Sequence, residues 1–335
     1  MNKTYVSVRD FLASILLCLA VSGCSEFLVN GPEVNRNMED FSAVDNLVRS
    51  RYPFLQFKQI NWDSVTESYR PLVVAATGDD IYPVLHRLLG ELKDGHVDLI
   101  TEGGFSTFTY DWPRRHGGKA YSPLVVRKYF DRELRLAGGG KMEYEILAGN
   151  IGYLYLSTFT AGDWIDDFDA ILDYLRDTKA IVIDVRNNGG GTSSACDFVV
   201  SRFATTPIRE VFYYPNGAYN SSIIRPRGPY QFLKPVVVLI NGASFSAAEL
   251  FPELMKQIPT VTTLGDTTGG GGGSSVIFHL PSNKRIQLPT MYFKRFDGTM
   301  VEWNGIPPDI LVPQTSEDIK QGHDKQLDRA IQLLR

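Results

Sequence analysis

The stretch PVVVLINGASFSAAELFPEL, residues 235–254, decides the fold, because in it a strand pattern passes directly into a helix pattern. The unbroken apolar run over residues 236–240 is typical of a strand buried on both faces, as in a parallel sheet. The corner that follows holds two serines, Ser244 and Ser246. Backbone N–H groups are free at the start of a helix, so a hydroxyl here can cap the helix or act as a nucleophile beside donors for an oxyanion.

The same alternation occurs on both sides of this stretch. Strand patterns are IGYLYLSTF, AIVIDV and TVTTLGD, at residues 151–159, 180–185 and 260–266. Helix patterns are DWIDDFDAILDYLRD and SSACDFVVSRF, at residues 163–177 and 193–203. Strands that alternate with helices predict crossover connections, and therefore a mainly parallel sheet with helices on both faces. We expect an α/β core over residues 151–335, ending in a helix formed by KQLDRAIQLL.

Two regions precede this core. Residues 38–95 contain three segments with apolar residues on one helical face, which predict a small helical N-terminal subdomain. Asn61 is the expected N-cap of the second helix. Residues 96–150 are rich in β-branched and aromatic residues and contain glycine clusters, so we expect a short strand-rich connecting segment.

The first residues have the pattern of an export signal. Lys3 and Arg9 precede the apolar run FLASILLCLAV, which is too short to span a bilayer. The small residues before Cys24 resemble the lipobox of bacterial lipoproteins. This resemblance implies a signal peptide over residues 1–23, lipid on Cys24, a tether over residues 24–37, and a membrane-anchored protein of the cell envelope. Ser25 after the cysteine favours the outer membrane.

Composition and cysteine usage set further bounds. A formal net charge of −4, without a basic stripe, gives no reason to expect a nucleic-acid partner. Once Cys18 is removed with the signal peptide and Cys24 is lipidated, Cys196 has no partner for a disulfide. We expect it to pack as a small buried apolar side chain.

Five blocks in order resemble the C-terminal-processing, or tail-specific, serine peptidases and their relatives, the tricorn protease core and the retinoid-binding repeats. The blocks are LKDGHVDL, IGYLYLSTF, IVIDVRNNGGG, NGASFSAAEL with the downstream LGDTTGGGG, and EWNGIPPDILV, which together cover roughly residues 85–315. The resemblance implies a crotonase-like (ββα spiral) α/β core and a peptidase that needs no metal or cofactor. The segment over residues 96–150 is too short for the PDZ domain of many relatives, so none is expected.

The resemblance also implies a catalytic set. Ser246 matches the nucleophile, and Ser244 is then a cap or turn hydroxyl. One branch of the family uses a lysine in the loop after the Gly-Asp-Thr-Thr block, but GDTTGGGGGSSV contains none, and Gly271 stands near that position. The tricorn-like branch uses a histidine oriented by an acid, which correspond to His96 and Glu302. A carboxylate on one imidazole nitrogen fixes the tautomer and stabilises the imidazolium.

Backbone groups complete the expected site. The RNNGGG loop implies that a backbone N–H near Gly190 and the N–H of Ala247 form the oxyanion hole. Asp184 and Arg186 are expected to anchor this loop rather than to take part in catalysis.

Two positions depart from the family pattern. Gly95 stands where the tricorn-like branch has a serine, and Pro252 lies inside the helix after Ser246, where it lacks an N–H and should kink the helix. These departures leave open a catalytically impaired relative that binds extended peptides or an apolar ligand. An amidase or esterase is also left open. The reading that we favour is a Ser/His/Glu endopeptidase that acts on peptides or unfolded proteins through an acyl-enzyme.

Overall fold

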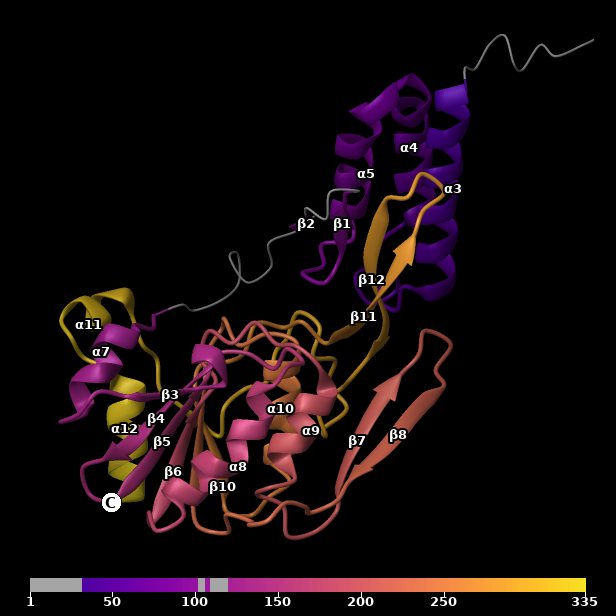
Figure 1. Ribbon diagram of the computed structural model, residues 1–335. Helices are drawn as coiled ribbons and strands as arrows, with labels where there is room; N and C mark the ends of the chain where they lie inside the picture. The colour runs from indigo at the N-terminus through magenta and orange to yellow at the C-terminus, as the bar shows by residue number, and fades with distance from the viewer. Residues whose placement is uncertain (1–31, 102–105, 109–119) are drawn as a thin grey trace, which may run out of the picture.

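The computed structural model describes residues 32–101, 106–108 and 120–335 (Figure 1). The expected signal peptide, Cys18 and Cys24 lie outside these residues. Within the described part of the chain, no helix is both long enough and apolar enough to cross a bilayer.

The larger sheet has the strand order β13-β10-β9-β6-β5-β4-β3. The pairs from β13 to β5 are parallel, whereas β4 and β3 add to the edge in antiparallel fashion. Its strands are β3 (Arg135–Ala137), β4 (Met142–Leu147), β5 (Ile151–Leu156), β6 (Ala180–Asp184), β9 (Val236–Ile240), β10 (Val261–Gly265) and β13 (Ile310–Leu311). The buried runs of β6 and β9 pair in parallel, which confirms the predicted α/β core.

Helices cover both faces of this sheet. The longer ones are α8 (Trp164–Leu175), α9 (Ser193–Val200), α10 (Ala247–Met255) and α12 (Lys325–Leu334). Figure 1 shows α8, α9 and α10 on one face and α12 on the other. Each face has its own buried cluster: Phe168, Val199 and Leu254 belong to the first, and Leu327 and Ile331 to the second. Short helical turns complete this part: α7 (Pro123–Val126), η2 (Arg127–Tyr129), η3 (Gly138–Gly140) and α11 (Ser316–Lys320).

The helical N-terminal subdomain consists of α3 (Pro32–Arg51), α4 (Trp62–Ala75), η1 (Gly78–Asp80) and α5 (Ile81–Gly90). Asn61 caps α4 as predicted, because its side chain accepts from the Ser64 N–H. The predicted tether was too long, since α3 begins at Pro32 and not after residue 37. Proline suits a first helical turn because the missing N–H needs no partner there.

The second sheet joins this subdomain to the core. Its order is β2-β1-β12-β7-β8, with β11 on β12, and its strands are β1 (Asp98–Ile100), β2 (Ser106–Phe108), β7 (Ile208–Tyr213), β8 (Tyr219–Ile224), β11 (Gly273–His279) and β12 (Arg285–Tyr292). Leu99, Ile286 and Leu288 pack in one cluster with the helices α3 and α5. The subdomain therefore lies against β1 and β12, and the turn between α5 and β1 reaches the core (Figure 1).

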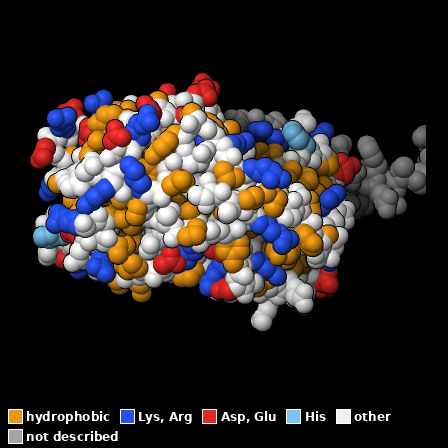
Figure 2. All heavy atoms as spheres, turned by 90° about the horizontal axis from the view of Figure 1, so that it is seen from below, with side chains coloured by type: hydrophobic (Ala, Val, Ile, Leu, Met, Phe, Trp, Pro, Cys, Tyr) orange, Lys and Arg blue, Asp and Glu red, His pale blue; other side chains and the backbone are white. Residues whose placement is uncertain are grey.

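The surface seen in Figure 2 carries lysine and arginine side chains interspersed with acidic and hydrophobic ones. No continuous basic stripe crosses this face. This is the mixed surface expected of a chain with a net charge of −4.

Substitution at Gly265 tests how closely β9 and β10 approach. An alanine there would bring Cβ within 2.0 Å of the Ile240 carbonyl oxygen at a positive φ of 134°. We expect Gly265→Ala to lower the free energy of unfolding by about 1–3 kcal/mol beyond the backbone cost, because two strand backbones cannot move apart cheaply. Urea unfolding measures the loss.

Gly149→Ala is the matched control. Its φ is also positive, at 84°, but nothing lies within 4 Å of the new Cβ. It should therefore lose only about 1–2 kcal/mol, the cost of a left-handed backbone for an alanine. An equal fall in the free energy of unfolding for the two variants would show that the backbones of β9 and β10 do not lie in close contact at Gly265.

Candidate active site

Ser246 occupies the sharp corner between β9 and α10. Its backbone has φ 59° and ψ −121°, a conformation that non-glycine residues rarely adopt. Helix α10 runs from Ala247 to Met255 with Pro252 inside it, so the proline does not end the helix. The corner thus places a serine at the mouth of an intact helix.

The side chain of Glu249 stabilises this corner through hydrogen bonds. Its Oε2 accepts from the Ser246 N–H at 3.0 Å and from the Gly271 N–H at 2.6 Å. Its Oε1 accepts from the Thr268 hydroxyl at 2.6 Å and from the Gly270 N–H at 2.7 Å. Burial raises the pKa of Glu249 to about 7, while these hydrogen bonds act to lower it. One buried carboxyl group therefore ties the serine corner to the glycine-rich loop after β10.

Ser244 has a structural role, as predicted. Its hydroxyl is buried, donates to the Val185 carbonyl at 2.8 Å and accepts from the Asn241 N–H at 3.1 Å. This hydroxyl stabilises the turn and does not line the pocket that holds Ser246.

His96 lies in the turn between α5 and β1, with 7% of its surface exposed. Its ring stacks on Phe245, with centroids 4.7 Å apart and planes 26° apart. The backbone N–H of His96 donates a hydrogen bond to Asp94 Oδ1 at 2.8 Å. The backbone carbonyl of His96 accepts from Gln287 Nε2 at 3.3 Å. The backbone of His96 is therefore fixed on both sides.

The imidazole itself is unbound. Neither Nδ1 nor Nε2 has a hydrogen-bond partner among the described residues. Burial lowers the pKa of His96 below 6.5; the charge of Asp94 opposes this effect and that of Lys58 adds to it. A buried imidazole with a lowered pKa is neutral at pH 7 and can accept a proton.

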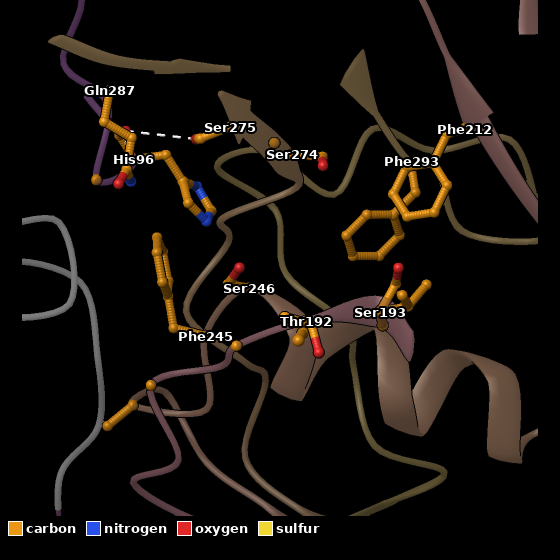
Figure 3. Close-up of a pocket in the computed structure, with 17 residues that line it drawn as sticks. His96, Thr192, Ser193, Phe212, Phe245, Ser246, Ser274, Ser275, Gln287 and Phe293 are labelled. Carbon is orange, nitrogen blue, oxygen red and sulfur yellow. Dashed lines mark hydrogen bonds between the residues drawn. The ribbon is translucent and has the colours of Figure 1, made fainter. Parts of the chain in front are cut away.

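A pocket of about 670 Å³ brings Ser246 and His96 together. Figure 3 shows the imidazole of His96 directed toward Ser246, with Phe245 packed on the other side of the imidazole. Phe212 and Phe293 lie on the far side of the pocket in Figure 3, and Leu250 and Thr192 also line it. The pocket thus combines Ser246 and His96 with an apolar wall and with the hydroxyls of Ser193, Ser274 and Ser275.

The structure does not bring Glu302 and the His96 ring together by a hydrogen bond, contrary to our expectation. Glu302 is 2% exposed, and its Oε1 pairs with Lys58 Nζ at 2.6 Å. Its Oε2 accepts from the Gly272 N–H at 3.2 Å. Burial raises the pKa of Glu302 to about 8, with the negative charge of Asp94 adding to this effect. The acid is close to the site, but its oxygens are occupied by other donors.

The expected oxyanion donors need one correction. The Gly190 N–H donates to Asn188 Oδ1 at 2.8 Å and is therefore not free. Within the described residues, the N–H groups of Ala247 and Gly191 donate to no acceptor, and both residues line the pocket. The Gly190 carbonyl accepts from the Phe159 N–H, so the N–H of Gly191, across the same trans peptide, points away from Phe159.

Arg186 anchors this loop, as predicted. Its guanidinium is fully buried and pairs with Asp184 at 2.6 Å and with Asp324 at 2.8 Å. The second contact joins the loop to the start of α12.

Cys196 is likewise buried as expected, and its Sγ lies 3.1 Å from the Ala247 carbonyl.

Lys58 and Asp94 are site residues that the sequence analysis missed. Lys58 Nζ lies 3.0 Å from Asp94 Oδ2, and both side chains are fully buried. Lys58 follows α3 in an irregular turn, where a lysine carries no signal in the sequence. Asp94 could have been noticed, because it precedes the histidine by two residues and a short acidic side chain often accepts from the backbone two residues on.

Comparisons with known proteins identify a family and a shared fold. Residues 150–312 match Peptidase family S41, and residues 34–90 match the Tricorn protease C1 domain. A crystal structure of a protein assigned as a peptidase, from Parabacteroides merdae, is 30% identical. It superposes with a TM-score of 0.78 and covers 89% of this chain and 96% of that chain. The expected crotonase-like α/β core is therefore confirmed as a shared fold.

Longer relatives match as well. The carboxy-terminal-processing protease of Bartonella bacilliformis is 30% identical over 187 residues, which are 53% of this chain and 42% of that protein. Tricorn protease homolog 1 of Streptomyces coelicolor is 24% identical over 383 residues, with 88% of this chain and 34% of that protein covered. The chain thus spans less than half of the length of these curated relatives.

Substitution of Glu249 tests the support of the serine corner. In Glu249→Gln, an amide NH2 replaces one carboxylate oxygen and faces two groups that are themselves donors. We expect the free energy of unfolding to fall by about 1–3 kcal/mol for each buried N–H that loses its acceptor. Urea unfolding at pH 8.5, where Glu249 is ionised because its pKa is about 7, measures this loss. The control is Glu317→Gln on the exposed part of α11, which should change stability by less than about 0.5 kcal/mol. A Glu249→Gln variant as stable as the parent would show that Glu249 does not stabilise the corner at Ser246.

Proposed function

The chain belongs to peptidase family S41, and on this basis we propose that it is a serine endopeptidase in which Ser246 is the nucleophile and His96 the general base. The observation that carries the proposal is the neutral imidazole of His96, unbound and directed toward Ser246 in one pocket (Figure 3). A serine hydroxyl is a weak nucleophile until such a group removes its proton.

A histidine rather than a lysine fits the space beside Ser246. The lysine of the other branch would stand near Gly271, but a Cβ on Gly271 would lie 2.2 Å from the Phe245 ring. That ring is the one on which His96 stacks. The phenylalanine therefore fills the place of a lysine side chain and supports the imidazole instead.

The reaction follows from these positions. Ser246 Oγ attacks the carbonyl carbon of a peptide bond while His96 takes the hydroxyl proton. The carbonyl oxygen becomes an anion, for which we propose the N–H groups of Ala247 and Gly191 as donors. The C–N bond then breaks as His96 returns the proton to the leaving amine. Water, activated by His96, releases the acyl group from Ser246.

The pocket favours an apolar side chain next to the cleaved bond. Beyond Ser246 its wall contains Leu250, Phe293 and Phe212, with the hydroxyls of Ser193 and Ser274 beside them and no charged side chain among the described residues, and the two phenyl rings lie edge to face at 6.1 Å. A charged side chain would lose its hydration there without a partner. We therefore propose unfolded polypeptides as substrates, cleaved after apolar residues.

We further propose that the protein is exported and that lipid on Cys24 anchors it to the outer membrane of the cell envelope. The basic start, the short apolar run and the small residues before Cys24 support this proposal. Metabolic labelling with a clickable fatty acid tests it, since Cys24→Ser should remove the label.

Substitution of the serine tests the activity. Ser246→Ala should abolish hydrolysis of casein and labelling by a fluorophosphonate probe, because it removes the hydroxyl toward which His96 is directed. Ser244→Ala is the matched control on the same turn and should retain the label if the variant folds. A parent protein that neither cleaves nor labels would overturn the proposal and favour a binder of extended peptides. Labelling and ester hydrolysis without peptide cleavage would favour an esterase.

The pH dependence tests the role of His96. The imidazole must be neutral to accept a proton, so kcat/KM should rise with pH and reach half of its plateau below pH 6.5, the ordinary value for histidine, since burial lowers the pKa. Initial rates between pH 4.5 and 9, with an apolar peptide as the substrate, measure this rise of kcat/KM. A rate that rises only above about pH 8 would indicate a lysine base and contradict the assignment.

A further inference from the structure

Lys58 is a buried cation that the proposed mechanism does not use. Its side chain is fully buried, and five oxygen atoms surround its ammonium group. They are Asp94 Oδ2 at 3.0 Å, Glu302 Oε1 at 2.6 Å, the Tyr52 hydroxyl at 2.9 Å and the carbonyls of Leu92 and Lys93 at 3.2 Å. The Trp303 ring lies 5.2 Å away. A buried charge is stable only with such a complete set of partners.

Asp94 connects this cation to His96. One of its oxygens pairs with Lys58, and the other accepts from the His96 N–H at 2.8 Å. Burial would raise the pKa of Asp94, but the charge of Lys58, the charge of His96 when its imidazole is protonated, and two hydrogen bonds lower it. The carboxylate is therefore ionised at neutral pH, and Lys58 fixes the side chain that fixes the histidine turn.

Glu302 connects the same cation to the opposite side of the site. Its second oxygen accepts from the Gly272 N–H, in the loop that packs against Phe245 through Gly271. Phe245 in turn stacks on the His96 ring. Lys58 thus lies between the turn that carries His96 and the loop that supports its ring.

We propose that Lys58 is a positioning residue, which holds Asp94 and Glu302 together and thereby sets the place of His96 relative to Ser246. This inference rests on the proposed function. It gives Glu302 an indirect part in place of a direct bond to the imidazole. It also makes the helical subdomain part of the active site, because Lys58 comes from the turn between α3 and α4.

Lys58 is not itself the base. Its ammonium is already bound by the carboxyl groups of Asp94 and Glu302, and Lys58 is not among the residues that line the pocket. The competing explanation is a structural one, in which Lys58 stabilises the junction of the subdomain and the core without affecting His96. The two explanations differ in what they predict for the titration of His96.

The test compares Lys58→Met with the parent in three measurements: kcat/KM, the rate of fluorophosphonate labelling of Ser246, and the NMR titration of His96. Because displacement of a catalytic group by about 1 Å costs on the order of 100-fold, we expect kcat/KM and the labelling rate to fall by about 10- to 100-fold, mainly in kcat. The pKa of His96 should rise, since a cation that lowers it is removed. Lys58→Arg keeps the charge and should recover part of the rate.

Two further variants keep the result decisive. Asp40→Asn removes another buried charge of the same subdomain, one that binds Ser282 far from the catalytic turn, and controls for lost stability alone. If Lys58→Met does not fold, Lys58→Gln retains a donor for one carboxylate and replaces it. A folded variant with unchanged labelling and an unchanged His96 titration overturns this inference alone. A parent protein without labelling or hydrolysis overturns the proposed function.

Discussion

The backbone of Ser246 is the constraint on which the rest of the site depends. A serine at φ 59° and ψ −121° is strained by about 1–3 kcal/mol and persists only where its surroundings hold it. Strand β9 fixes the corner on one side, because it is buried between two parallel neighbours. On the other side Glu249 accepts from the Ser246 N–H and from the loop after β10. The strain leaves the Ala247 N–H free beside the hydroxyl, which is what an oxyanion requires.

The second requirement is a base at a fixed place, and three parts of the chain meet it together. The helical subdomain contributes Lys58, the turn before β1 contributes Asp94 and His96, and the loop before β13 contributes Glu302. The ring of His96 rests on Phe245, which directly precedes Ser246. Base and nucleophile are therefore positioned through neighbouring residues, although they are far apart in the sequence.

Much of this could be predicted from the sequence, because the informative signals are local. The apolar runs of β6 and β9 are typical of buried strands, and their alternation with helices predicts a parallel sheet. The family blocks predict Ser246 as the nucleophile and His96 as the base, and the structure brings these two residues into one pocket. The partner of Glu302 could not be predicted, since the choice between His96 and Lys58 depends on how three distant segments pack. The prediction that the Gly190 N–H is an oxyanion donor is wrong for a similar reason, because this N–H donates to the side chain of Asn188.

The most direct measurement is the crystal structure of the protein after reaction with a fluorophosphonate. Our account predicts phosphorus bonded to Ser246 Oγ, with its anionic oxygen within hydrogen-bond distance of the N–H groups of Ala247 and Gly191. The imidazole of His96 should lie beside the serine oxygen, with Asp94, Lys58 and Glu302 unchanged. An adduct on another residue, or an oxygen that meets neither N–H group while His96 points away, would contradict it.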